Sequence, residues 1–274
     1  MGGALGLIAG TGDLPRLIAE DAEARGEDLL VVRYAGVEAP WADRLPHVDL
    51  PFEKPGRLFA ALRAAGVRRV CFAGAMVRPR LDPLRFDLKA LTLIPKVPPL
   101  LKKGDDAMLR GFAAIFAEEG FEVVAAHDLL EGLLAPAGTL SARAPTPEET
   151  ADAARAAEIV RVLGALDVGQ GAVVAGGLCL GVEAIAGTDA LLAEVARVPA
   201  RLRLTPGGVL FKGPKPGQDR RVDLPAVGAR TLRGAAEAGL TGVALAAGGV
   251  LLLGREDCAA EADRLGLALW GVAG

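Results

Sequence analysis

The chain has 274 residues, of which 51% are hydrophobic and 24% charged, a composition typical of a folded globular protein. This length is enough for one large domain or for two domains of ordinary size. The pI near 5.6 argues against a general nucleic-acid-binding protein, which would usually be basic. The N-terminus has neither a basic region nor a long apolar run, so we expect no signal peptide and a cytoplasmic protein. Resting on a membrane surface is compatible with that expectation.

The thiols and imidazoles form no recognisable metal or disulfide pattern. Cys71, Cys179 and Cys258 are far apart in apolar, strand-like segments, and we interpret all three as buried thiols in a reducing compartment. His47 and His127 have no His or Cys neighbour at metal-ligand spacing, which argues against a zinc site. We therefore expect the chemistry of the protein to come from carboxylates and cations.

The first half of the chain alternates apolar runs with helical patterns. Runs at residues 5–9, 29–33 and 69–74 predict strands, and their alternation with helices indicates a Rossmann-like parallel α/β sheet. The first strand leads into Gly10-Thr11-Gly12-Asp13, a strand, glycine turn and helix layout that points backbone N–H groups at a phosphate. Pro15 stands where the dinucleotide motif has its third glycine, so a tight β–α turn without a ligand is the competing interpretation.

Ligands of parallel sheets lie at the carboxyl ends of the strands. Gly74-Ala75-Met76 occupies that position after the third strand, and the cations of Arg78-Pro79-Arg80 follow directly. Lys102-Lys103-Gly104-Asp105-Asp106 then opens a further helix. Its two aspartates suit the positive end of the helix dipole, and a metal or ribose-hydroxyl contact is the functional alternative.

A proline-rich stretch with little periodicity separates the two halves. We therefore predict an N-terminal Rossmann-like domain of residues 1–134, a linker of residues 135–146 and a C-terminal mixed α/β domain of residues 147–274. Thr146-Pro147-Glu148-Glu149 is a capping box that starts the first helix of the second domain.

The second half mixes hairpins with helices. Gly176-Gly177 lies between two apolar runs and predicts a β-hairpin. The tract 243–253 is too short for a membrane span, and Gly248-Gly249 within it predicts two strands joined by a tight turn. Thr188 is expected at the N-cap of a helix, where the free N–H groups are also suited to a phosphate.

The segment 211–225 concentrates charge and constrained backbone. Pro214 and Pro216 prevent a helix, and residues 211–221 carry four cations against one carboxylate in a chain of net charge −3. A rigid cationic loop suits an anion such as phosphate. Asp223 follows at the expected end of a short strand, where a carboxylate is able to bind Mg²⁺ or orient water. The alternative is a solvated loop in which Asp223 only caps a turn.

Together these features favour phosphoryl chemistry. The sequence contains no nucleophile elbow and no Cys–His pair in a recognisable context. Carboxylates and cations suit Mg²⁺-assisted transfer at a phosphoryl centre, where positioning and charge stabilisation do most of the catalysis.

A set of short motifs, each weak alone, also occurs in a fixed order over the whole chain. They are 6–15 (GLIAGTGDLP), 72–74 (FAG) with 78–79 (RP), 103–106 (KGDD), 167–171 (DVGQG), 183–184 (EA), 187–189 (GTD), 212–216 (KGPKP) with Gln218, and 221–225 (RVDLP). In this order and spacing the chain resembles the two-domain form of the UDP-2,3-diacylglucosamine pyrophosphatase family of lipid A biosynthesis.

The resemblance implies hydrolysis of the pyrophosphate of UDP-2,3-diacylglucosamine to UMP and 2,3-diacylglucosamine 1-phosphate, with attack at the phosphorus next to the sugar. It implies dependence on a divalent cation, with Mg²⁺ expected, and a homodimer. It also implies cytoplasmic work on an acylated UDP-sugar, with peripheral contact at the inner face of the inner membrane left open.

The resemblance also assigns roles to residues. Asp223 matches the essential aspartate of the family, as metal ligand or general base for water. Lys212, Lys215 and Gln218 are expected to hold the pyrophosphate oxygens, and Thr188 to add a donor. The substrate contacts expected from the first domain, which would make the site interdomain, are Gly10, Thr11, Gly12, Asp13, Gly74, Ala75, Met76, Lys103, Asp105 and Asp106.

A substrate with two acyl chains needs an apolar groove. We expect it in a proline-punctuated stretch that makes a poor ordinary helix, from Leu91, Leu93, Ile94, Val97, Leu100 and Leu101. A core-packing loop is the competing interpretation.

Two other functions stay open at this stage. A non-catalytic nucleotide-sugar sensor would use the same glycine turns and cationic loop for binding alone. A nicotinamide oxidoreductase is disfavoured by the missing third glycine and by Arg33 and Tyr34, which stand where an acidic residue is expected at the end of the second strand.

Overall fold

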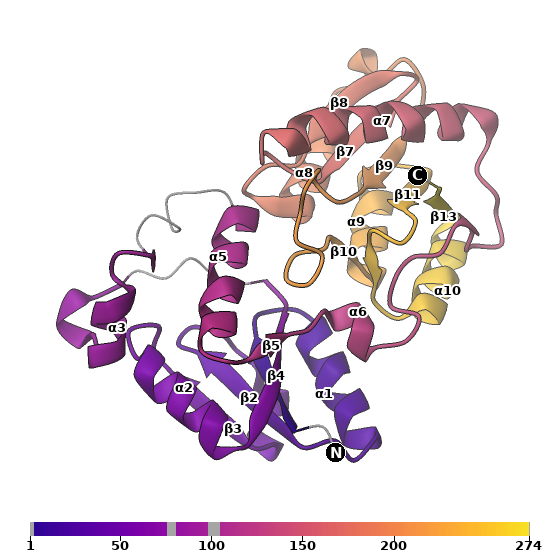
Figure 1. The fold of residues 1–274 in the computed structure, drawn as a ribbon. Coiled ribbons are helices and arrows are strands. Elements are labelled where there is room, and N and C mark those ends of the chain that lie inside the picture. Colours follow the sequence, from indigo (N-terminus) through magenta and orange to yellow (C-terminus); the bar gives the residue numbers. More distant parts are fainter. Residues whose placement is uncertain (1–2, 76–80, 98–104, 274) are drawn as a thin grey trace. The chain divides into compact units, whose positions relative to one another are not determined.

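The computed structural model describes residues 3–75, 81–97 and 105–273. It divides into two compact units, whose helices and strands are labelled in Figure 1. Unit 1 consists of Met1–Glu131 with Asp219–Asp223, and unit 2 consists of Gly132–Gln218 with Leu224–Gly274. Each unit has its own sheet and its own hydrophobic core.

Unit 1 is built on a five-stranded sheet in the order β3-β2-β1-β4-β5, in which all neighbouring strands are parallel. The strands are β1 (Ala4–Ala9), β2 (Leu29–Tyr34), β3 (His47–Leu50), β4 (Val67–Ala73) and β5 (Glu122–Val123). The helices include α1 (Leu14–Ala24), α2 (Pro55–Ala64), α3 (Leu88–Leu93), α5 (Asp105–Glu118) and α6 (Ala126–Leu129). This arrangement confirms the predicted Rossmann-like sheet.

Helices cover both faces of this sheet (Figure 1). On one face, alternate residues of β1, β2 and β4 point into a core shared with α2 and α5. There Phe59 of α2 and Phe116 of α5 meet edge to face, with ring centroids 5.2 Å apart. On the other face α1 buries the apolar stripe that helical spacing predicts, including Ile18 and Ala22.

Strand β3 is not predicted by the sequence patterns. Of its four residues only Leu50 is buried, so the segment lacks an apolar run. An ion-pair cluster ties it to β2 instead: the Arg33 guanidinium lies 2.7 Å from Asp49 Oδ1 and 2.6 Å from Asp43 Oδ1. Arg33 therefore has a structural role at the end of β2.

Unit 2 is built on a six-stranded mixed sheet in the order β6-β13-β11-β9-β7-β8. Its strands are β6 (Gly138–Thr139), β7 (Gly171–Ala175), β8 (Leu178–Val182), β9 (Val209–Lys212), β11 (Gly242–Ala246) and β13 (Ala268–Val272). A separate parallel pair is formed by β10 (Ala226–Val227) and β12 (Leu251–Leu252). One helix, α7 (Pro147–Ala165), covers one face, and the other face is covered by α8 (Gly187–Ala196), α9 (Ala229–Glu237) and α10 (Arg255–Leu265).

Local signals at the start of unit 2 are confirmed. The capping box of α7 is complete, with the Glu149 N–H donating to Thr146 Oγ1 at 3.2 Å and the Thr146 N–H donating to Glu149 Oε2 at 2.8 Å. Strands β7 and β8 form the predicted hairpin, with Gly176 and Gly177 at φ of 57° and 80°. Asp152 of α7 accepts hydrogen bonds from both glycine N–H groups, which fixes the turn onto the helix.

The expected linker 135–146 contains part of unit 2. Within it, β6 pairs antiparallel with β13, and the Ala135 N–H donates to the Val250 carbonyl at 2.9 Å. Two residues are too few for a periodic pattern, so sequence reading gives no strand here.

The predicted hairpin at Gly248-Gly249 is wrong. Strand β11 pairs with β9 and β13, while β12 pairs with β10, so the two strands flanking these glycines do not pair with each other. Gly249 is needed for another reason. A Cβ at this position would lie 2.9 Å from Pro214 Cδ, so the absence of a side chain lets the cationic loop approach closely.

The interpretation of three buried thiols is wrong for one of them. Cys71 and Cys258 are buried, but Cys179 on the edge strand β8 is exposed. Burial raises the pKa of the Cys71 thiol to about 12 and that of Cys258 to about 11, so both stay protonated near neutral pH.

Candidate functional site

The cationic loop of unit 2, residues 213–218, follows β9 and is hydrogen-bonded to the segment after α7. The Gly213 N–H donates to the Gln170 carbonyl at 3.1 Å. Lys215 Nζ lies 2.5 Å from Asp167 Oδ1, and Gln218 Nε2 lies 3.4 Å from Gln170 Oε1. Within the loop, the Lys215 N–H donates to Gln218 Oε1 at 2.8 Å. These bonds give residues 213–218 a defined conformation.

The loop also packs directly against the end of α7. A Cβ on Gly164 would lie 3.1 Å from Pro216 Cδ and 3.3 Å from the Lys215 Cα, so glycine leaves room for this close approach. The Lys215 side chain is 10% exposed, and Gln218 is buried. The alternative of a solvated loop is therefore wrong for these two residues, although Arg220 is exposed.

A buried polar cluster lies at the base of the loop. Lys212, the last residue of β9, is only 2% exposed. Its Nζ lies 2.5 Å from Glu183 Oε2 and 2.7 Å from Thr188 Oγ1, and the Thr188 hydroxyl donates to Glu183 Oε2 at 2.9 Å. A Cβ on Gly171 would lie 2.6 Å from the Glu183 carboxylate, so glycine at that position leaves room for the cluster. The structure brings together Lys212 and Thr188, with Glu183 joining them.

Thr188 does not act as the predicted N-cap. Helix α8 is preceded by Ala186 as its cap residue, and no side chain caps that end. The Thr188 hydroxyl has instead the Glu183 carboxylate as its acceptor. Contacts with Glu183 and Lys212 thus take the hydroxyl that the local sequence assigns to the helix end.

Asp223 lies in a short turn that belongs to unit 1. The Val222 and Asp223 N–H groups both donate to the Asp219 carbonyl at 3.1 Å. The Arg221 guanidinium lies 2.8 Å from Asp219 Oδ2, and this hydrogen-bonded ion pair lowers the Asp219 pKa below its usual value. Asp223 itself is half-buried and precedes β10, so the expectation that it ends a strand is wrong.

The two glycine turns of unit 1 meet at the carboxyl ends of β1 and β4. The Gly10 N–H donates to the Ala73 carbonyl at 2.7 Å, and the Thr11 N–H donates to the Ala75 carbonyl at 2.9 Å. A Cβ on Gly10 would lie 2.5 Å from the Ala75 carbonyl oxygen, which explains the glycine. The Gly10 and Thr11 N–H groups are thus committed to this pairing and are available to a ligand only if it breaks.

The remaining predicted contacts of unit 1 are placed as follows. Gly74, at φ of 85°, packs against the backbone of residues 10–11, while Gly12 and Asp13 are exposed beside the start of α1. Asp105 and Asp106 begin α5, as predicted. Met76 and Lys103 lie outside the described residues.

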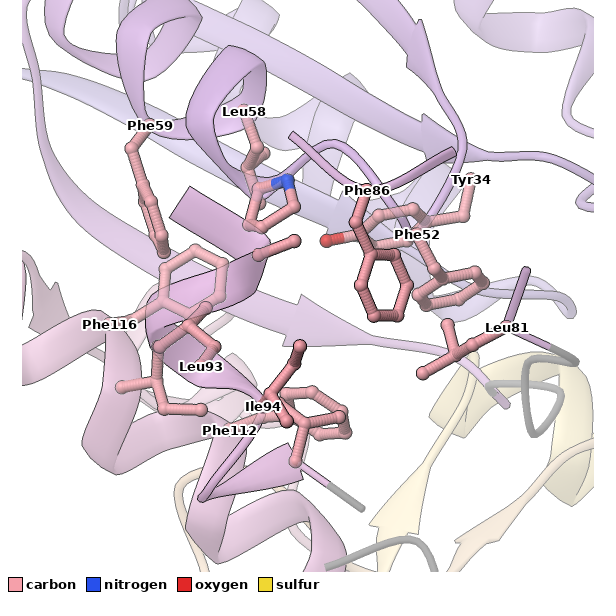
Figure 2. Close-up of a pocket in the computed structure, with 14 residues that line it drawn as sticks. Tyr34, Phe52, Leu58, Phe59, Leu81, Phe86, Leu93, Ile94, Phe112 and Phe116 are labelled. Carbon is pink, nitrogen blue, oxygen red and sulfur yellow. The ribbon is translucent and has the colours of Figure 1, made fainter. Parts of the chain in front are cut away.

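Unit 1 also contains an apolar pocket, shown in Figure 2, with a volume of about 80 Å³. Its lining residues are Tyr34, Phe52, Pro55, Leu58, Phe59, Leu81, Phe86, Ala90, Leu93, Ile94, Val97, Phe112, Ile115 and Phe116. The hydroxyl of Tyr34 is the one polar side-chain group in this set. Its ring stacks on Phe52 with centroids 3.9 Å apart, and burial raises the Tyr34 pKa above its usual value.

The pocket coincides in part with the expected apolar groove. Leu93, Ile94 and Val97 line it, while Leu91 is 52% exposed and is not among the lining residues. Leu100 and Leu101 lie outside the described residues. Leu93 and Val97 also pack against the core of unit 1, so the competing interpretation of a core-packing segment stays open beside the groove.

The described residues also bear on metal binding and on membrane spanning. Residues 3–75, 81–97 and 105–273 contain no group of three or more His, Cys, Asp or Glu side chains arranged to hold a metal ion. None of the described helices has the length and apolar character needed to cross a bilayer.

Comparison with known proteins identifies the family. The family model for the LpxI N-terminal domain matches residues 4–133, and the model for the LpxI C-terminal domain matches residues 136–270. The chain is 44% identical over 271 residues to the UDP-2,3-diacylglucosamine pyrophosphatase LpxI of Caulobacter vibrioides. The aligned region covers 98% of this chain and 97% of that protein. The chain belongs to the LpxI family. The resemblance inferred from the sequence motifs is confirmed.

The sequence-based site omits three residues that hold it together. Glu183, Asp167 and Gln170 contact Lys212, Lys215 and Gln218, respectively. The signal was present, because all three lie in the short motifs of residues 167–171 and 183–184. Their partners follow 29 to 48 residues later in the chain, so local patterns do not reveal the pairing.

We expect Glu183→Gln to lower the free energy of unfolding by about 3–5 kcal/mol, because it leaves the buried Lys212 ammonium without its counter-charge. The double variant Glu183→Gln/Lys212→Met should recover part of that loss. Urea unfolding of the two single variants and the double variant measures the coupling. Glu256→Gln, at an exposed position of α10, is the matched control. Additive losses in the double variant would contradict the buried pair.

Proposed function

We propose that this protein hydrolyses the pyrophosphate of UDP-2,3-diacylglucosamine to UMP and 2,3-diacylglucosamine 1-phosphate in lipid A biosynthesis. The observation that carries the proposal is 44% identity over 98% of the chain to an LpxI protein of that name. The ordered cationic loop of unit 2 and the apolar pocket of unit 1 are the features expected for a ligand with both pyrophosphate and acyl groups.

In this proposal the loop binds the pyrophosphate. Lys215 and Gln218 are held by Asp167 and Gln170, so little conformational freedom is lost when an anion binds. Lys212 stabilises the base of the loop and does not contact the substrate directly in this proposal. Its buried ammonium group is bound to Thr188 and Glu183, and a direct contact with the substrate would require these two hydrogen bonds to break. The N-terminus of α8, which Thr188 adjoins, adds backbone donors.

Asp223 orients or deprotonates the attacking water in this proposal, and it also serves as the ligand of a divalent cation. A single half-buried carboxylate fits Mg²⁺, which is usually held by one or two carboxylates together with substrate phosphates and water. When bound, the cation neutralises charge that develops on the phosphate oxygens. In unit 1, the backbone N–H groups of exposed Gly12 and Asp13, at the start of α1, are the proposed donors to the substrate.

Hydrolysis of UDP-2,3-diacylglucosamine in ¹⁸O-labelled water, first with Mg²⁺ and then with excess chelator, tests the function. We expect metal-dependent release of UMP with the label in the sugar phosphate. Label in UMP would keep the reaction but move the attack to the other phosphorus. Tight nucleotide-sugar binding without turnover would support the sensor instead.

Asp223→Ala should reduce kcat by about 10²–10⁴-fold, the range for loss of a positioned general base. Circular dichroism and thermal unfolding should match the parent protein. The control is Asp128→Ala, at an exposed carboxylate of α6. Parent-like turnover by a folded Asp223→Ala protein would remove Asp223 from the mechanism.

We further propose that the pocket of unit 1 holds an acyl chain, because its lining is apolar apart from one hydroxyl. Leu93→Gln should raise KM for the diacylated substrate by about ten-fold, since a polar amide would be buried without a partner. Turnover of a deacylated analogue should be unchanged. Leu91→Gln, on the same helix but outside the pocket lining, is the control in detergent micelles. Equal losses on both substrates would indicate misfolding.

We also propose a homodimer that pairs through β8. This strand is at one edge of the described six-stranded sheet and contains no charged residue, although Leu178 and Val182 are 43% and 36% exposed. Native edge strands usually carry a charge or a proline that blocks pairing, so β8 suits a two-fold contact with a second copy. Val182→Lys should convert a dimer to a monomer in light scattering, while Val162→Lys on α7 should not. A monomeric parent protein would refute this interface.

A further inference from the structure

The exposed large hydrophobic side chains of unit 1, among its described residues, all come from one short segment. Leu84 is 95% exposed, Leu88 85%, Leu91 52% and Ile94 43%. Scattered exposed leucines are common on protein surfaces, but four large apolar side chains exposed within eleven consecutive residues favour an interaction surface. We refer to these four residues as the leucine patch.

The leucine patch belongs to the segment of residues 81–97, which also borders the apolar pocket. Leu81, Phe86 and Leu93 from the same segment line the pocket, and Figure 2 shows them around the cavity. Ile94 both lines the pocket and is partly exposed, so it lies at the rim. One side of the segment therefore faces the cavity while the other side is open to solvent.

Hydrogen bonds hold the leucines in this exposed position. The Asp82 carboxylate accepts from the Leu84 N–H at 3.0 Å, and Asp87 accepts from the Ala90 N–H at 2.8 Å at the start of α3. Asp87 also accepts from the Gly56 N–H at 2.8 Å, which fastens the segment to α2. Both carboxylates are therefore directed at backbone donors, and the segment is a structured part of the unit.

Basic side chains accompany the leucine patch. Arg85 is exposed between Leu84 and Leu88. Lys96 forms an ion pair with Glu118, the last residue of α5, and Lys89 forms one with Glu119, which follows that helix. Long basic side chains beside exposed leucines are typical of surfaces that lie at the headgroup level of a bilayer.

We propose that the leucine patch inserts into the surface of a phospholipid bilayer, with Arg85 at the level of the lipid phosphates. An acyl chain then passes from the bilayer over Ile94 into the pocket with a shorter exposure to water. Continuity with the pocket is what favours a lipid surface over a protein partner. The delivery step rests on the proposed function, whereas membrane binding itself does not.

Flotation with vesicles of phosphatidylethanolamine and phosphatidylglycerol, free of substrate, tests the proposal. The double variant Leu84→Ser/Leu88→Ser should bind about ten-fold or more weakly, because it removes two inserted aliphatic side chains. Leu202→Ser/Leu204→Ser is the matched control, since these leucines of unit 2 are 58% and 71% exposed. Arg85→Glu should weaken binding to the anionic vesicles more than to vesicles of phosphatidylcholine.

Three results would overturn the proposal: a parent protein that does not float with vesicles, an equal loss in the control pair, or retained vesicle binding with a changed oligomeric state in the Leu84/Leu88 variant. Turnover in detergent micelles separates this inference from the proposed function. We expect the Leu84/Leu88 variant to retain parent-like turnover there, because the pocket lining and the cationic loop are unchanged. A parent protein without turnover would refute the function and leave the vesicle result to decide membrane binding.

Discussion

The buried contact between Lys212 and Glu183 fixes the part of unit 2 that carries the cationic loop. An isolated ammonium group in the interior would be costly, and its carboxylate partner at 2.5 Å makes the burial tolerable. The same carboxylate accepts from Thr188, so one side chain sets the end of β9 and the start of α8 together. The cationic loop begins at the next residue. Its geometry is therefore set by a charge pair that lies beneath it.

A second constraint, independent of the first, shapes the edge of the sheet in unit 1. The backbone of Thr11 exchanges two hydrogen bonds with Ala75, in both directions, at 2.9 and 3.0 Å. This pairing closes the turns after β1 and β4 against each other and requires glycine at positions 10 and 74. Glycine there serves a backbone contact first. In the proposed function, phosphate binding is therefore assigned to the N–H groups beyond these glycines, at the start of α1.

Periodicity and turn chemistry reveal the parts of this fold that are locally determined. The parallel sheet, the capping box of α7 and the hairpin at Gly176-Gly177 follow from apolar runs, a cap and a φ preference, and all three are present. The second glycine pair misleads because Gly249 is required by the approach of Pro214, which comes 35 residues earlier in the sequence. β3 is missed because an arginine and two aspartates hold it, without an apolar run.

The candidate site divides in the same way. Lys212, Lys215 and Gln218 are recognisable from composition and motif order. Their partners Glu183 and Asp167 are not, because ion pairs between residues far apart in the sequence produce no periodic pattern. The apolar groove illustrates the reverse case. Leu93, Ile94 and Val97 are identified from a proline-punctuated apolar stretch, although the expectation that this stretch makes a poor helix is wrong for Leu88–Leu93, which form α3. The opposing wall of Phe112 and Phe116 comes from α5, whose pattern is that of an ordinary core helix.

A ligand that joins a pyrophosphate to acyl chains makes opposite demands on its protein. The phosphate needs fixed donors, whereas each CH₂ group of an acyl chain loses about 0.8 kcal/mol of favourable transfer free energy when it is left in water. An enclosed pocket meets the second demand only after the chain has arrived. While the acyl chain moves from the bilayer to the pocket, the free-energy cost depends on how much of the chain is exposed to water. Leucines exposed far from the pocket would not reduce this cost. In the proposed membrane-bound state, Ile94 at the rim, with Leu88 and Leu91 in the adjoining helix, would shorten the part of the route that lies in water.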